Sequence, residues 1–390
     1  MAWVDQTTMD QRFCFVASCV RGDERMSVLC RRHEISRKTG YKWLGRYRAY
    51  GAAGLADHSS ARLTHPPGSP PEVAAAILAL RDKRPSWGPA KLRSRLVRDN
   101  PAMVFPAAST IGDLLTRQGR VVARPRRPKR ASSLGPVVEP VAANDSWAAD
   151  FKGWWRTGDG VRCEPLTVTD GYSRFILVNH AVARPTFAEI KPLFIAAFRN
   201  CGLPVALRTD NGSPFAHRGG LAGLTQFSVW LLTLGIWPDR IVPGRPDQNG
   251  KHERMHRTLE AEAARPRAAS VALQQATLDA WREDFNTQRP HQALDQRCPA
   301  ELYTPSSRPY VETGVAWDYP IDHQVRRVRA DGYISWQDNK LYLTEALAGE
   351  TVALARRDDG DWAIRFRQFD VARLGAENGT LIRSGLARTG

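Results

Sequence analysis

The chain has 390 residues, 42% of them hydrophobic and 25% charged, and a formal net charge of +16 at pH 7. This length predicts two to four domains, and the composition is typical of a globular protein in water rather than of a membrane protein. No apolar run approaches the length that spans a bilayer, so we expect no membrane partner.

The cellular compartment follows from the N-terminal residues and the cysteines. The stretch MAWVDQTTMDQRF lacks the basic start and apolar run of a secretory signal. The six cysteines lie scattered, without a Cys-x-x-Cys pair, which favours reduced and partly buried thiols. We therefore expect a cytoplasmic protein.

The positive charge is concentrated near the N-terminus. Residues 1–144 contain 25 Lys and Arg against 11 Asp and Glu, whereas the remainder contains 31 against 29. A basic half joined to a near-neutral half is typical of a DNA-reading part followed by a processing part. A merely basic solvated surface is the alternative.

The first domain, residues 1–60, is predicted to be all-α. Amphipathic patterns indicate helices at 9–20 and 24–35, and a third helix begins after the N-cap candidate Ser36. Three short helices with a basic third one resemble a helix-turn-helix, whose second helix of the pair lies in the major groove. The side chains then expected to face DNA are Arg37, Lys38, Tyr41, Lys42 and Arg46.

A second helical domain follows a linker at 61–70 and occupies residues 71–122. Its predicted helices cover 71–84, 88–100 and 108–119, the last opening at a Ser-Thr cap. This pattern again resembles a helix-turn-helix, and two such domains would read a longer DNA site than one.

Residues 123–144 form a basic, Pro-rich linker that cannot pack a core. Such a segment is expected to run extended along DNA phosphates. Its candidate DNA contacts are Arg126, Arg127, Lys129 and Arg130.

Residues 145–305 predict an α/β domain. Three strands in hairpin order are followed by a helix, a strand, a helix, a strand and a long polar helix, at 147–155, 164–170, 173–183, 186–202, 204–210, 224–235, 236–242 and 251–264. This order is that of a ribonuclease H-like core with a mixed five-stranded sheet.

The C-terminal part predicts an all-β domain. A linker at 306–324 precedes short alternating runs at 325–375, which indicate a small antiparallel barrel of about five strands. Residues 376–390 are expected to form a tail. The fold class is therefore multidomain.

Three acidic residues lie where this topology would bring them together. Asp150 ends the first core strand, Asp210 ends the fourth, and Glu253 lies early in the last long helix. Carboxylates are hard ligands suited to Mg²⁺ or Mn²⁺, and two such ions about 4 Å apart can support in-line displacement at phosphorus. The pair Asn211-Gly212 predicts a tight turn that holds Asp210 at the sheet edge.

Five strings in this region closely resemble the integrase catalytic core of bacterial insertion-sequence transposases. They are WAADFKGWW, PLTVTDGYSRF, RTDNGSPF, PGRPDQNGKHERMHRTLE and NTQRPHQALDQRCPAELY. The resemblance covers about residues 145–305. It implies a DDE transposase, retroviral-integrase-like, in which Asp150, Asp210 and Glu253 are the catalytic residues and the ligands of two Mg²⁺ or Mn²⁺ ions.

The resemblance also implies the reaction and its partners. The expected activity is cleavage at the 3′ end of the element's terminal inverted repeats and transfer of that end into target DNA. The protein would act on double-stranded DNA as a dimer or tetramer, in bacteria, associated with the nucleoid. Asp210 and Glu253 enclose 42 residues, more than the usual thirty-five or so, and the extra length is expected in the loop HRGGLAGLTQ.

Other polar residues near the acids have less certain roles. Lys251, Arg254 and Arg257 could hold DNA phosphates or form a solvated helix face. His252 and His256 are expected to contact DNA or be exposed, rather than approach the metals.

Two further motifs in this domain are expected to be structural. Asp170 is expected to cap the Thr-Asp-Gly-Tyr-Ser turn. The motif of Asn286, Arg289, Pro290 and His291 is interpreted as packing and DNA positioning.

Two alternatives use the same features. A DNA-binding regulator or inactive remnant would use the helical domains without catalysis, and loss of a carboxylate would favour it. A stand-alone nuclease on the same fold would cut without joining. A strand-transfer assay distinguishes a protein that cuts and joins DNA from one that only cuts it.

Overall fold

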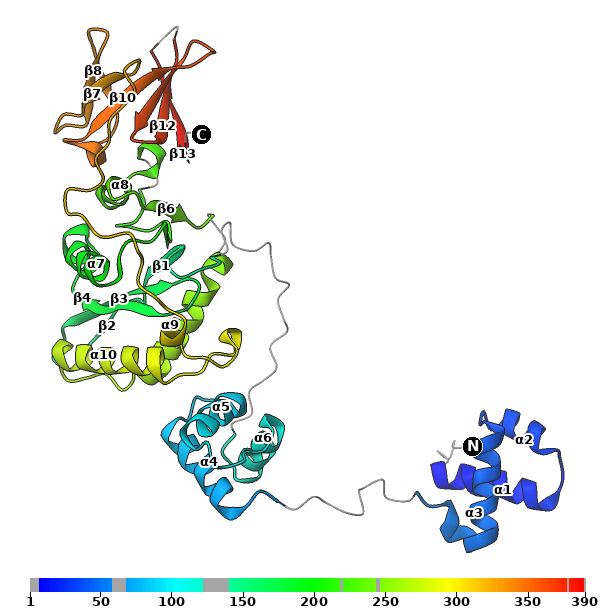
Figure 1. Ribbon diagram of the computed structural model, residues 1–390. Helices are drawn as coiled ribbons and strands as arrows, with labels where there is room; N and C mark the ends of the chain where they lie inside the picture. The colour runs from blue at the N-terminus through cyan, green and yellow to red at the C-terminus, as the bar shows by residue number, and fades with distance from the viewer. Residues whose placement is uncertain are drawn as a thin grey trace. The chain divides into compact units, whose positions relative to one another are not determined.

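The computed structural model describes residues 7–57, 68–121, 140–217, 220–242, 246–376 and 379–388. They fall into two compact units, residues 1–68 and 69–390 (Figure 1). The expected phosphate contacts Arg126, Arg127, Lys129 and Arg130 lie outside the described residues. Within the described part, no helix is long and apolar enough to cross a membrane. All six cysteines are unpaired, as expected.

The first unit is a three-helix domain with its own small core. It consists of α1 (Thr8–Arg21), α2 (Met26–Arg32), α3 (Arg37–Tyr50) and the 3-10 turn η1 (Gly51–Leu55). The Ser36 hydroxyl accepts a hydrogen bond from the Thr39 N–H at 3.1 Å, so the predicted N-cap is confirmed. The helices enclose Phe15, Leu29, Trp43, Leu44 and Leu55.

Close packing of α3 depends on a glycine. A Cβ atom at Gly40 would lie 2.6 Å from Cys30 Sγ and 2.9 Å from Phe15 Cζ. Because real Cβ atoms do not approach this closely, α3 can lie against α1 and α2 at this distance when residue 40 has no side chain.

The second unit begins with another three-helix domain, made of α4 (Pro71–Lys83), α5 (Pro89–Asp99) and α6 (Ala108–Arg117). Its core contains Ile77, Trp87, Leu92 and Ile111. The Ser-Thr cap expected for α6 is wrong, because Ala107 is the N-cap and makes no side-chain hydrogen bond. The helix begins at Ala108, so both hydroxyls lie inside its first turn.

A mixed sheet forms the centre of the second unit. Its strands are β1 (Ser146–Phe151), β2 (Trp155–Arg156), β3 (Arg162–Asp170), β4 (Ile176–Val182), β5 (Ala206–Thr209) and β6 (Trp237–Arg240). The strands β4, β3 and β1 pair antiparallel, and β1, β5 and β6 pair parallel. The predicted five-stranded sheet therefore has a sixth, two-residue strand, since the run 147–155 breaks at Gly153, where φ is +88°.

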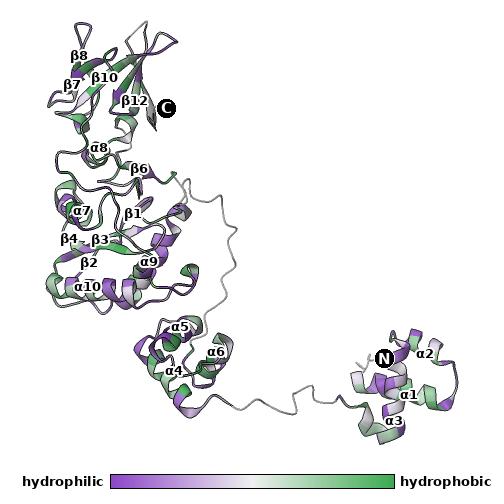
Figure 2. Ribbon diagram, viewed as in Figure 1, coloured by the Kyte–Doolittle hydropathy of each residue, from purple (hydrophilic) through white to green (hydrophobic). Residues whose placement is uncertain are grey.

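Helices cover both faces of this sheet. The helices α7 (Phe187–Cys201) and α8 (Gln226–Thr233) pack on one face through Phe194, Phe198 and Phe227. The helices α9 (Gly250–Glu262) and α10 (Val271–Thr287) lie on the other face (Figure 2). Their residues Leu259 and Leu278 are fully buried. The sequence had not predicted α10.

The C-terminal part is an antiparallel sheet in the order β13-β12-β11-β10-β7, beside a hairpin of β8 and β9. The strands are β7 (Gln324–Arg327), β8 (Tyr333–Trp336), β9 (Asn339–Tyr342), β10 (Thr351–Arg356), β11 (Trp362–Phe366), β12 (Phe369–Leu374) and β13 (Leu381–Arg388). Closure into a barrel stays a prediction. Because β13 pairs with β12, residues expected to form a tail belong to this sheet.

The enlarged loop between Asp210 and Glu253 has a packing role. Within it, Leu221 and Leu224 are buried in the same cluster as Phe369 and Leu374 of β12. Val229 and Leu232 of α8 join that cluster. The loop and α8 therefore attach the C-terminal sheet to the α/β core.

Candidate functional site

Two of the three predicted carboxylates lie at the same edge of the sheet. The strands β1 and β5 are parallel neighbours, with Ser146 opposite Ala206 and Ala148 opposite Arg208. Because Asp150 is two residues beyond Ala148 and Asp210 is two beyond Arg208, this register brings the acidic residues side by side.

A tight turn fixes Asp210, as predicted. The Gly212 N–H donates to Asp210 Oδ1 at 3.0 Å. A Cβ atom at residue 212 would lie 3.1 Å from the other carboxylate oxygen, so a side chain there would crowd the acid. The Asn211 side chain donates to the Ile241 carbonyl at 2.7 Å and ties this turn to the end of β6.

The start of α9 supplies the third carboxylate and an amide. Glu253 lies in the first turn of α9 and is exposed. Asn249, the N-cap residue, donates from Nδ2 to Asp150 Oδ2 at 3.2 Å. No local sequence pattern predicts this contact, since the two residues are 99 positions apart.

The electrostatics of Asp150 link the three acids. Burial, with the negative charges of Asp210 and Glu253, raises the pKa of Asp150 to about 7. Both other carboxylates are therefore close enough to Asp150 to repel its charge, which is the arrangement that a bound cation relieves.

Two histidines lie behind Asp150 and are buried. Thr167 Oγ1 donates to the Asp150 carbonyl at 3.0 Å and lies 2.6 Å from His252 Nε2 and 2.7 Å from His256 Nε2. Because the single hydroxyl proton goes to that carbonyl, both imidazoles donate from Nε2. His256 Nδ1 then lies 3.9 Å from Asp150 Oδ2.

These contacts correct the expected role of the histidines. His252 is 2% exposed and His256 is 9% exposed, so neither is an exposed DNA contact. Burial lowers the pKa of both imidazoles, which are neutral at pH 7. Their function is to hold Thr167, and through it the backbone at Asp150, in place.

Replacing Thr167 with valine tests this support. The substitution keeps the shape and leaves two buried N–H donors unpaired, at about 1–3 kcal/mol each. We expect the free energy of unfolding, measured with urea, to fall by about 2–6 kcal/mol. The exposed Thr277, replaced in the same way, serves as the control and should change stability by less than about 0.5 kcal/mol. Equal effects of the two substitutions would contradict a supporting role.

The donor set fits a hard divalent cation. Asp150, Asp210 and Glu253 offer carboxylate oxygens, the ligands that Mg²⁺ and Mn²⁺ prefer. One nitrogen each of His252 and His256 and an Asp150 oxygen also lie within 4.8 Å of one another. However, both nitrogens of His252 bond to threonine hydroxyls, of Thr167 and Thr169, so this histidine is not free to bind a metal.

The basic residues predicted to contact DNA lie on helix surfaces. Arg37, Lys38, Tyr41 and Lys42 on α3 are exposed, whereas Arg46 is half-buried and stacks on Trp43. On α9, the side chains of Lys251, Arg254 and Arg257 are exposed.

Two other motifs make the packing contacts expected of them, while DNA positioning by the Asn286 motif stays a prediction. Asp170 is 1% exposed and accepts hydrogen bonds from the Ser173 N–H and hydroxyl and from the Asn144 N–H. Asn286 accepts from the Ile176 N–H at 2.8 Å and donates to its carbonyl at 3.0 Å, which attaches α10 to β4.

Comparison with protein families identifies the domains. Residues 140–246 and 234–299 match families that are both described as an integrase core domain. Residues 14–63 match a helix-turn-helix domain, and residues 39–115 match a homeodomain-like domain.

Solved structures with some likeness are viral. The simian T-cell lymphotropic virus intasome, in complex with PP2A regulatory subunit B56 gamma, is 14% identical at a TM-score of 0.38, over 80% of this chain and 99% of that chain. The HTLV-2 integrase catalytic core domain in complex with magnesium is 13% identical at a TM-score of 0.30, over 42% of this chain and 99% of that chain. Likeness at this level adds nothing to the fold described above.

Curated relatives come from bacterial insertion elements. A 31.7 kDa protein of insertion element IS407 from Burkholderia multivorans is 28% identical over 240 residues, which are 59% of this chain and 80% of the relative. A 39.2 kDa protein of IS476 from Xanthomonas euvesicatoria is 26% identical over 281 residues, 70% and 76% of the two chains. The chain therefore belongs to the bacterial insertion-sequence transposases that carry an integrase core domain and helix-turn-helix domains.

Proposed function

We propose that this transposase binds the terminal inverted repeats of its own element, cleaves the 3′ ends and transfers them into target DNA. The observation that carries the proposal is the convergence of Asp150, Asp210 and Glu253, supported by the effect of the other two charges on the pKa of Asp150. Carboxylates placed together at a sheet edge destabilise the metal-free fold, and they form a suitable ligand set for cations.

Each residue of the site has a role in this proposal. Divalent ions bound there would supply Lewis-acid stabilisation of charge at the reacting phosphate. Asp150 and Asp210 hold their carboxylates from the rigid strand ends, and Glu253 contributes its carboxylate from α9. Asn249 orients Asp150 through its amide, and Thr167 holds the backbone carbonyl of the same residue.

DNA binding is assigned to two surfaces. In the domain of residues 1–60, the third helix would enter the major groove with Arg37, Lys38, Tyr41, Lys42 and Arg46. In the catalytic domain of residues 145–305, Lys251, Arg254 and Arg257 flank Glu253 and would contact phosphates. Two element ends must be held together, so the active form is proposed to be a dimer or tetramer on DNA.

The test is Mg²⁺-dependent cleavage and strand transfer on a labelled fragment that carries the element's own end. We expect the wild type to cut and join. Glu253→Gln should bind DNA with unchanged affinity and cut at least about a thousandfold more slowly, since the metal site supplies several kcal/mol to the transition state.

Other outcomes separate the alternatives. Cleavage without joining would identify a nuclease. Sequence-specific binding by a wild type that never cuts, alone or with other copies of the chain, would identify a DNA-binding regulator and contradict the catalytic assignment.

A further inference from the structure

A pocket lies where the domain of α4–α6 meets the α/β core. Its lining comes from α5, from the turn between β3 and β4, from the first turns of α9 and from the segment after α10. Six lysine or arginine side chains line it, against one acidic side chain. The lining residues that carry the argument are Lys91, Arg174, Asn249, Arg254, Arg289 and His291.

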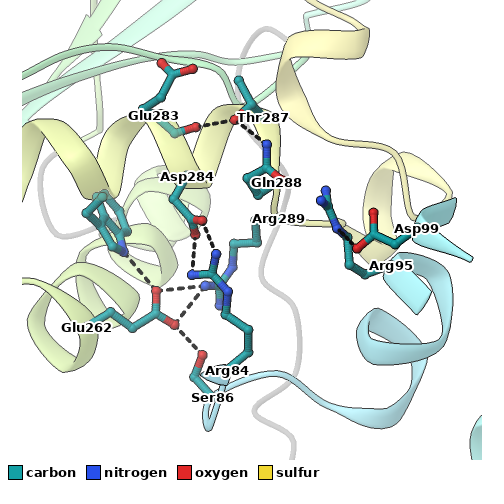
Figure 3. Close-up of polar contacts among 11 residues, drawn as sticks. Arg84, Ser86, Arg95, Asp99, Glu262, Glu283, Asp284, Thr287, Gln288 and Arg289 are labelled. Atoms are coloured by element: carbon teal, nitrogen blue, oxygen red, sulfur yellow. Dashed lines mark hydrogen bonds and ion pairs between the residues drawn. The ribbon is translucent and has the colours of Figure 1, made fainter. Parts of the chain in front are cut away.

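Polar contacts hold α4–α6 against the core at this place. Arg84 donates to both carboxylate oxygens of Asp284 on α10, and Ser86 donates to Glu262 at the end of α9 (Figure 3). At the other end of α5, Arg98 donates to Glu301 at 2.5 Å. Lys91 lies between these contacts in sequence. The contacts hold α5 against the core, and Lys91 lies in the wall of the pocket.

The positive side chains of the lining outnumber its one acidic side chain. Arg289 pairs with Glu262 and Arg208 with Asp239, and Asp170 already accepts hydrogen bonds from Asn144 and Ser173. Burial, with the positive charges of Arg289 and Arg174, lowers the pKa of Lys91 to about 8. Burial also lowers the pKa of Arg174, as does Arg254. Such a concentration of like charge is unfavourable unless an anion neutralises it.

A buried imidazole in the same wall lacks a partner. His291 is 8% exposed, and its Nε2 has no hydrogen-bond partner among the described residues. Burial, followed by Lys91, Arg289 and Arg174, lowers its pKa to about 3, so the ring is neutral. A buried polar atom without a partner is rare in folded proteins and points to a missing ligand.

We propose that this pocket binds a phosphate group of the DNA backbone, held jointly by Lys91 of the second helical domain and by Arg174, Arg254 and His291 of the core. A phosphate offers oxygen acceptors to the cations and to a ring N–H of His291. The inference rests on the proposed function, which it deepens. Asn249 lines the pocket and bonds to Asp150, so the bound phosphate would lie next to the carboxylate site.

The test is the salt dependence of DNA affinity. We expect Lys91→Gln to weaken binding about tenfold at physiological salt and to lower the slope of log affinity against log salt by about one, the signature of one lost phosphate contact. Lys83→Gln removes the same charge from the exposed end of α4 and should leave the slope unchanged. Lys91→Arg should restore the slope.

The remaining outcomes overturn the proposal or one part of it. Equal slopes for wild type and Lys91→Gln, or equal losses for the two Gln variants, would overturn the pocket. If inorganic phosphate raises the Tm of the wild type but not of Lys91→Gln, and the DNA slope is unchanged, the ligand is free phosphate rather than DNA. DNA-free Lys91→Gln should melt no lower than the wild type, which excludes misfolding. If the wild type binds DNA with the expected slope but never cuts it, the proposed function is contradicted and the phosphate pocket is not.

Discussion

Replacing Asp150 with asparagine is expected to abolish strand cleavage and, at the same time, to stabilise the metal-free protein above neutral pH. The first effect follows from the loss of a cation ligand, and we expect a rate at least about a thousandfold lower. The second follows from the carboxylate's surroundings, because burial and the charges of Asp210 and Glu253 raise its pKa to about 7.

The sign of the pH dependence follows from this raised pKa. The folded state holds the Asp150 proton more tightly than the unfolded chain does, so its contribution to stability is present below the unfolded pKa and is lost as pH rises through about 7. At pH 8 the wild type therefore carries a charge cost of up to about 4 kcal/mol, which asparagine avoids. Near pH 4 the two proteins should be equally stable.

Urea unfolding at pH 8 and pH 4, in the presence of a chelator, measures this difference. Asp338→Asn, in the exposed turn between β8 and β9, is the matched control and should show no pH-dependent gain. Saturating Mg²⁺ should stabilise the wild type and not Asp150→Asn, because the cation binds the folded site alone. An Asp150→Asn protein less stable than wild type at pH 8 would contradict the electrostatic account.

The α/β core was the most predictable part of the fold. Alternating apolar strands and amphipathic helices indicate their own secondary structure, and the hairpin order then restricts the topology. The acids at 150 and 210 follow from this topology, since parallel strands end at a common edge. Glu253 follows from the helix that begins just before it.

The contacts behind the acids could not be predicted in this way. Thr167 and His252 are 85 residues apart, and Arg84 and Asp284 are 200 apart, so no local pattern joins them. The burial of the histidines did have a signal. His252 and His256 are four residues apart on α9 and share its buried face with Leu259. The helical period of 3.6 residues, applied to this segment, predicts that both histidines are buried.

Replacing Glu262 with alanine is expected to be among the most destabilising single changes in the second unit. This carboxylate accepts two hydrogen bonds from Arg289 at 2.8 Å, one from Trp281 Nε1 at 2.8 Å and one from Ser86 (Figure 3). Burial alone would raise its pKa, but these partners lower it overall. The stability that it contributes is thus present at neutral pH and is lost as the carboxylate is protonated in acid.

Removal of Glu262 leaves Arg289, which is 6% exposed, without its counter-ion and beside Lys91. Breaking a buried pair from one side costs about 3–5 kcal/mol, and we expect the free energy of unfolding at pH 7 to fall by that amount. Glu283→Ala is the control, because the Glu283 carboxylate is exposed and makes no contact among the residues drawn in Figure 3. This substitution should change stability by less than about 0.5 kcal/mol.

A second substitution separates the ion pair from simple loss of packing. Arg289→Met in the Glu262→Ala background removes the unpaired charge and keeps most of the side-chain volume, so it should recover much of the lost stability. If the double variant is as unstable as Glu262→Ala, the cost comes from the bonds to Trp281 and Ser86 instead. Since Ser86 belongs to the α4–α6 domain, that result would make Glu262 chiefly a docking residue. Limited proteolysis at residues 84–88, between α4 and α5, would then increase in both variants.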